Sequence, residues 1–139
     1  MNYVDTFIQV APDCPVQTGV VPSTRGERKP AHVLQYELIS KNPYRYTQED
    51  VQWQVHVLHK AIPARQLRSR SRQMRDDFLN RPQACLRSSA LAKRYGWGFH
   101  FDKDGGIALY AVESPEYHRF TRSGSRGPKL LSAMRSKRA

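Results

Sequence analysis

Two alternating runs of apolar and polar residues, joined by Lys103-Asp104-Gly105-Gly106, constrain the fold of this chain most strongly. A three-residue loop with Gly105 in the left-handed region, a type I turn followed by a bulge, pairs Asp102 with Gly106. That register puts the bulky side chains on one face: Trp97, Phe99, Phe101, Ile107, Leu109 and Ala111. It puts the remaining side chains on the other face: His100, Asp102, Ala108, Tyr110 and Val112. Because a two-residue loop would mix the two sets, burial favours the bulged hairpin.

Two further strands are predicted, over residues 6–11 and over residues 51–58. In the second run, β-branched and aromatic residues alternate with Gln and His, which is typical of a half-buried strand. Helices are predicted over 31–40 and 63–80, although the 31–40 segment also fits a strand. Ser114-Pro115-Glu116 indicates the start of a short final helix.

These elements predict a single α+β domain. Its sheet is small, antiparallel or mixed, with about four strands (6–11, 51–58, 97–102 and 106–112) and with helices packed on one face. The length of 139 residues suits one modest core. We expect the domain to span residues 1–118.

Positive charge is concentrated at the end of the chain. The 23 Lys and Arg against 12 Asp and Glu give a net charge of +11, and no acidic residue follows Glu116. Residues 119–139 carry +7 of that charge, and after Phe120 the composition is dominated by Ser, Gly, Arg and Lys. We therefore expect residues 119–139 to form a flexible basic tail.

Several classes of protein are disfavoured by the composition. No apolar run approaches the roughly 18 to 20 residues of a membrane span, and the first 20 residues lack a secretory signal pattern. Cys14 and Cys85 are too far apart in sequence to indicate a disulfide framework or a cysteine zinc site, so a cytoplasmic protein is expected. His100 and Asp102 with His118 imitate an iron site, but no further ligand pair supports a metal, and no nucleotide loop indicates a cofactor.

The strongest candidate for a binding site is the segment 85–102. It offers cations and hydroxyls beside the hairpin, which suits a small anionic ligand: Arg87, Ser88, Ser89, Lys93 and Arg94, with His100 and Tyr110. His100 is the one plausible proton carrier near neutral pH, so catalysis is left open with His100 as its weak candidate. An N-capped turn with solvated cations explains the same residues equally well.

Two alternative functions remain open. The predicted 63–80 helix exposes arginines that could bind nucleic-acid phosphates together with the basic tail, namely Arg65, Arg68, Arg72 and Arg75. No helix-turn-helix, zinc-finger or RNA-binding aromatic motif accompanies them. A small protein-interaction domain, with a partner or a second copy on the exposed sheet face, is the other alternative.

The chain also resembles a family of small bacterial and fungal proteins classed as a domain of unknown function. The resemblance rests on segments spread over residues 3–118: Thr6-Phe7-Ile8-Gln9-Val10-Ala11-Pro12-Asp13, Leu34-Gln35-Tyr36-Glu37-Leu38, Asn42-Pro43-Tyr44-Arg45-Tyr46-Thr47-Gln48-Glu49-Asp50-Val51, Cys85-Leu86-Arg87-Ser88-Ser89, Lys93-Arg94-Tyr95-Gly96-Trp97-Gly98, His100-Phe101-Asp102 and Ala108-Leu109-Tyr110. It implies membership of that family, without an activity, a cofactor or a catalytic residue.

Overall fold

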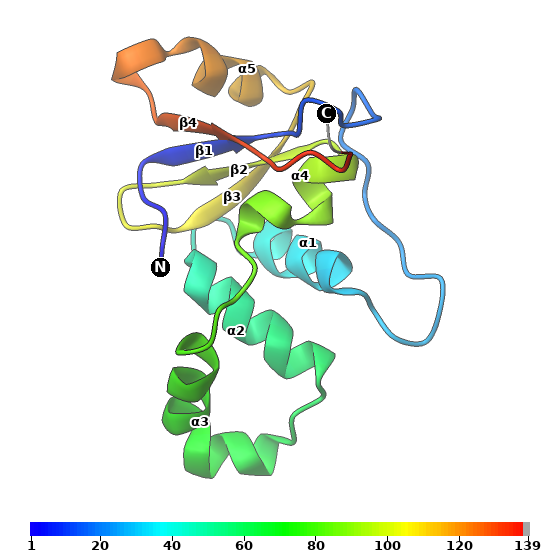
Figure 1. Cartoon of the computed structure of the whole chain (residues 1–139), viewed down its shortest axis with the longest axis vertical. Helices are drawn as coiled ribbons and strands as arrows, with labels where there is room; N and C mark the ends of the chain where they lie inside the picture. The colour runs from blue at the N-terminus through cyan, green and yellow to red at the C-terminus, as the bar shows by residue number, and fades with distance from the viewer. Residues whose placement is uncertain (138–139) are drawn as a thin grey trace.

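A computed structural model describes residues 1–137 of the chain as an α+β fold (Figure 1). Its elements follow in this order: β1 (Thr6–Gln9), α1 (Ala31–Lys41), α2 (Gln48–His59), α3 (Ala64–Leu79), the 3-10 turn η1 (Leu86–Ser88), α4 (Ala90–Arg94), β2 (Trp97–Phe101), β3 (Ile107–Ala111), α5 (Pro115–Arg122), the 3-10 turn η2 (Gly124–Arg126) and β4 (Lys129–Ser132). No helix among these described residues is both long and apolar enough to cross a bilayer.

The four strands form one mixed sheet in the order β3-β2-β1-β4. The β2–β3 hairpin has the predicted register, with Phe99 opposite Leu109 and His100 opposite Ala108. Its turn is the predicted bulged one, because the Asp102 N–H donates to the Gly106 carbonyl at 2.9 Å and Gly105 has a φ of +85°. Strand β1 is antiparallel to β2 and parallel to β4.

Helices cover both faces of this sheet, so the prediction of helices on one face only is wrong. Helices α1, α2 and α4 lie against one face, whose core includes the fully buried Ile8, Phe99 and Phe101. The short helix α5 lies across the other face, where Tyr117 makes an edge contact with Phe7 (Figure 1). Successive side chains of β1 and β2 therefore point alternately into two separate clusters, one on each face of the sheet.

The predicted strand over residues 51–58 is wrong, because this segment belongs to helix α2. Thr47 and Asp50 form a reciprocal capping box at its start. One side of α2 buries Val51 and Val55 in the sheet-side core, and another side places Trp53 against Phe78 of α3. Burial against two partners produces an apolar alternation that imitates the period of a strand.

The predicted flexible tail is also wrong for the described residues 119–137. The expected boundary at residue 118 falls inside α5, and the chain then returns to the sheet as β4. Ala133, just after β4, is buried, and its N–H donates to the Gln9 carbonyl at 2.9 Å. Beyond the strand, the Asp13 carboxylate accepts from the backbone N–H groups of Ser136 and Lys137. Residues 138–139 of the predicted tail lie outside the described residues.

Candidate functional site

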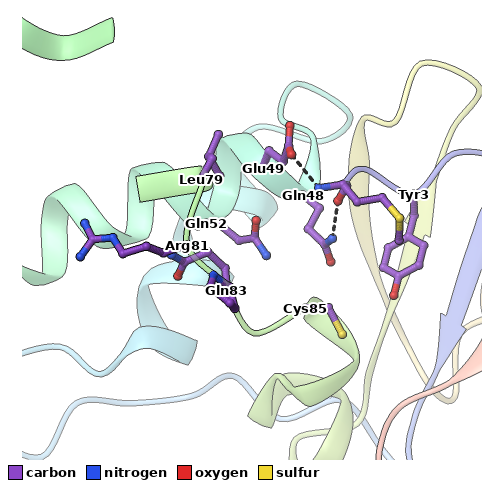
Figure 2. Close-up of a pocket in the computed structure, with 10 residues that line it drawn as sticks. Tyr3, Gln48, Glu49, Gln52, Leu79, Arg81, Gln83 and Cys85 are labelled. Atoms are coloured by element: carbon purple, nitrogen blue, oxygen red, sulfur yellow. Dashed lines mark hydrogen bonds and ion pairs between the residues drawn. The ribbon is translucent and has the colours of Figure 1, made fainter. Parts of the chain in front are cut away.

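A first hollow, of about 280 Å³, lies between the N-terminal segment, α2 and the chain after α3. Figure 2 shows Tyr3 and Cys85 on one side of this hollow and Arg81 on the other. Its amide side chains are already engaged in internal hydrogen bonds. Gln48 donates to the Met1 carbonyl and accepts from the Leu86 N–H. These bonds join α2 to the N-terminal segment and to η1, so the polar groups of this hollow serve the fold and are not free for a ligand.

A second hollow, of about 240 Å³, contains the two serines of the predicted anion site. The Ser89 hydroxyl is buried, donates to the Gln35 carboxamide oxygen at 2.6 Å and accepts from the Leu91 N–H. The Ser88 hydroxyl donates to the Cys85 carbonyl at 2.7 Å. The Ser89 hydroxyl therefore caps α4 and the Ser88 hydroxyl bonds within η1, which is the structural alternative that the sequence left open.

The sheet separates the predicted site residues into two groups. Ser89, Lys93 and Arg94 lie at or in α4, which packs on the face that holds Phe99. Arg87, beside them in η1, donates from Nε to the Ser132 carbonyl at 2.8 Å. His100 and Tyr110 point to the opposite face, as their predicted register requires. The seven residues therefore do not share one pocket.

The face that carries His100 opens into a third hollow, of about 470 Å³, between the hairpin turn, α5 and η2. We call it the His100 cleft. It is lined by charged side chains from separate parts of the chain and by one aromatic ring: Asp5, His100, Asp102, Lys103, Arg119, Phe120, Ser123, Arg126, Gly127 and Pro128. Cations from the turn, from α5 and from η2 thus line the same hollow as one imidazole.

The His100 imidazole is held in place by an aromatic and hydrogen-bonded frame. Phe120 stacks on the ring, with centroids 4.1 Å apart and an interplanar angle of 18°. The Tyr44 hydroxyl lies 2.8 Å from His100 Nδ1 and 2.8 Å from the Tyr110 hydroxyl. This frame engages Nδ1, and among the described residues no hydrogen bond involves Nε2. The second ring nitrogen therefore remains for a ligand.

The protonation states of this frame follow from its burial. Burial lowers the pKa of His100 below its ordinary value, while the nearby charges of Asp102 and Asp5 oppose that shift. Burial raises the pKa of Tyr44, and its hydrogen bond to Tyr110 adds to the effect. At neutral pH the imidazole is therefore uncharged and the Tyr44 hydroxyl keeps its proton. The position of the imidazole proton depends on which way that hydroxyl points.

The charged side chains of the cleft are not neutralised by one another. Within residues 1–137 three ion pairs form, and none of them involves Lys103, Arg119 or Arg126. The Asp102 carboxylate instead accepts from the N–H groups of Asp104 and Gly106, which stabilises the turn. The three cations are thus available to a ligand.

Two residues that build the cleft have unusual backbone conformations. Asp5, which lines the cleft, has a φ of +47°, and Tyr44, which holds the imidazole, has a φ of +63°. For residues with a side chain this left-handed conformation costs of order 1 to 3 kcal/mol, and such residues cluster at functional sites. Tyr44 is fixed there because its N–H donates to the Ile107 carbonyl at 2.7 Å, and a Cβ on Gly106 would overlap the Tyr44 carbonyl.

The sequence indicated part of this cleft and missed the rest. His100 and Tyr110 were predicted on one face, which the hairpin register places correctly. Tyr44 was missed because its loop is remote in sequence, although its position before a capped helix marked an ordered turn. Arg119 and Arg126 were missed because they were assigned to the flexible tail. The helix start at Ser114 was the signal that structure continues past residue 118.

Comparisons with known proteins assign the chain to a family. No curated protein and no solved structure matches it. A family model described as a family of unknown function matches residues 1–139, so it includes β4 and the residues after it. The chain therefore belongs to DUF6157, a family of unknown function.

Proposed function

We propose that this protein binds a small organic or inorganic anion in the His100 cleft. The observation that carries the proposal is the convergence of Lys103, Arg119 and Arg126 from three separate elements around a framed imidazole. Solvated surface cations need no such common focus. A volume of about 470 Å³ accommodates a ligand of metabolite size.

The two guanidinium groups give the site its preference for oxyanions. Arginine presents several N–H donors in a rigid planar array, which matches carboxylate and phosphate oxygens. Arg119 and Arg126 would hold the anionic group, and His100 Nε2 would form a further hydrogen bond to it. Asp5 and Asp102 line the same cleft and disfavour highly charged polyanions, so a compact ligand with one or two negative groups fits best.

This arrangement makes binding dependent on pH. A bound anion favours the imidazolium form, so it raises the pKa of His100 in the complex above its value in the free protein. The affinity for the anion therefore increases as the pH falls through the pKa of His100, which lies below the ordinary value of about 6.5.

Isothermal titration calorimetry with inorganic phosphate and with sulfate tests the proposal. Arg119→Gln should lower the affinity for whichever of these two anions binds more tightly by about tenfold, because it removes a charge-assisted hydrogen bond. Arg122→Gln is the matched control: it lies in the same helix with its Nε on the His118 carbonyl, and it does not line the cleft. Equal weakening by both substitutions would contradict the proposal, since it would show only a general effect of charge.

A second pair of variants examines the imidazole. His100→Gln retains a polar side chain and loses the titratable group, so the binding of sulfate, which stays a dianion in this range, should become independent of pH between about 5 and 7. His59→Gln removes an imidazole at the end of α2, outside the cleft, and should leave the pH dependence intact. Retention of the full pH dependence in His100→Gln would show that another group is responsible.

A further inference from the structure

Helix α3 stands apart from the rest of the molecule in both packing and charge. It packs on α2 and lies farther from the sheet than the other helices (Figure 1). From Ala64 to Gln73 every residue is exposed except the half-buried Leu67. Only the second half of α3 is anchored, where Phe78 is buried against Trp53 and His56. The first half is therefore a helix with almost no tertiary partner.

The exposed half of α3 is strongly cationic. No acidic residue occurs between Asp50 and Asp76. Arg65 and Arg68 are three residues apart, which places them on one side of the helix, and Arg68 and Arg72 line one hollow. Arg75 follows Arg72 by three residues but is already paired with Asp50 at 2.7 Å.

A kink brings a further arginine to the same surface. The helix departs from helical geometry at Arg70, where φ is −137°. The side chains around this kink line a shallow hollow of about 570 Å³: Arg68, Ser69, Arg70, Ser71, Arg72, Gln73, Asp76 and Asp77. Asp76 and Asp77 contribute two carboxylates to this hollow, and the arginines, the serines and Gln73 form the rest. We call Arg65, Arg68, Arg70 and Arg72 the α3 arginine surface.

We propose that the α3 arginine surface binds the phosphodiester backbone of double-stranded DNA without reading its sequence. Arginine side chains and serine hydroxyls are common donors to phosphate oxygens. A projecting helix, about 10 to 12 Å across with its side chains, matches the width of the major groove, which is about 12 Å. The major groove of duplex RNA is too narrow and deep for such a helix.

A nucleic acid suits this surface better than an acidic protein does. Stable protein interfaces surround an apolar or aromatic centre, whereas the α3 arginine surface contains neither. Interfaces with DNA are more polar and much more positively charged. A helix segment of this length is only marginally stable alone in water. A row of phosphates would also stabilise it, because the phosphates would neutralise the repulsion between its arginine side chains.

This surface is independent of the His100 cleft and of the C-terminal cations. Strand β4 lies at the sheet end of the molecule, and α3 lies at the far end of its long axis (Figure 1). The sequence had suggested that the α3 arginines and the basic C-terminal segment bind one nucleic acid together. The structure does not place their described residues on one common face. DNA binding by α3 can fail or succeed whatever the result for anions at His100.

Fluorescence anisotropy of a labelled mixed-sequence DNA duplex, measured with the full chain over a series of salt concentrations, tests the proposal. Each phosphate contact adds about 0.9 to the slope of log affinity against log salt. The triple variant Arg65→Gln, Arg68→Gln, Arg72→Gln should therefore reduce the slope by about 2.7. Glutamine propagates helices nearly as well as arginine, and circular dichroism checks that α3 persists.

The matched control removes the same charge elsewhere. Arg25, Lys41 and Arg94 are exposed and lie outside α3, so their triple change to Gln should leave most of the slope in place. An equal reduction by both triples would overturn the proposal, because the net charge of +11 alone would then explain binding. Displacement of the duplex by poly-glutamate at equal charge concentration would also overturn it in favour of an acidic polypeptide. Equal affinity for an RNA duplex would contradict the role of the major groove.

Discussion

The two faces of the sheet are built from alternate residues of the same strands, yet they differ in chemistry. The face under α1, α2 and α4 holds Phe99 and Phe101 in a continuous apolar core. The face under α5 holds His100 in a frame of tyrosines and Phe120, and it opens into a cleft. A short helix covers part of a sheet face and leaves an edge accessible. The first face therefore supplies most of the stability, and the second positions the candidate site.

The largest expected difference between the faces comes from two phenylalanine substitutions. Phe99→Ala empties a fully buried position and should lower the free energy of unfolding by about 3 to 5 kcal/mol. Phe120→Ala removes a half-buried ring, so its loss should be less than half as large. Urea unfolding followed by circular dichroism measures both. Equal losses would mean that the α5 face contributes as much to stability as the main core.

A smaller effect is expected where α5 meets the sheet. At Gly98, an added Cβ would lie 2.6 Å from Phe7 Cζ and 2.8 Å from Tyr117 Cε2. Gly98→Ala should therefore displace α5 and lower the free energy of unfolding by about 1 to 3 kcal/mol. Gly26→Ala is the control, since a Cβ there meets no atom within 4 Å. Wild-type stability in Gly98→Ala would show that α5 is not held closely against β2.

The hydroxyl of Tyr44 should have a modest effect on stability and a clear effect on binding. Tyr44→Phe removes the partner of both His100 and Tyr110 and should cost about 1 kcal/mol. It should also weaken anion binding, because the imidazole loses its fixed orientation. Tyr46→Phe provides the comparison: its hydroxyl makes no hydrogen bond to the described residues. Unchanged anion affinity in Tyr44→Phe would show that the hydrogen bond from Tyr44 to the imidazole does not contribute to binding.

The smallest effect concerns acid stability. Burial lowers the pKa of His32, His56 and His100, so the unfolded chain binds more protons than the folded one near pH 6. Their contribution to the free energy of unfolding is therefore complete above about pH 6.5, and it is lost as the pH falls from there through the lowered pKa values of the folded protein. Replacing one of these histidines with Gln should make the fall of Tm with decreasing pH less steep, as measured by thermal unfolding. A decline unaffected by all three single substitutions would assign it to carboxylates.

The sequence predicted those parts of the fold that depend on local chemistry. The hairpin register follows from one glycine-containing turn and the pattern beside it, so it was obtained correctly. Helix α2 was mistaken for a strand because Val51 and Trp53 are buried by different partners, which a pattern along one segment does not reveal. Strand β4 was missed because its pairing with β1 joins residues more than a hundred positions apart. The cleft depends on the same long-range return of the chain, so only His100, Asp102 and Tyr110 could be anticipated.

The most direct test of the account is the NMR titration of the His100 imidazole with and without saturating phosphate. In the free protein, its pKa should lie below the ordinary value of about 6.5, because the ring is buried. With phosphate, that pKa should increase, and Arg119→Gln should reduce the increase. A His100 pKa that stays constant while phosphate binds would place the anion elsewhere and contradict the account.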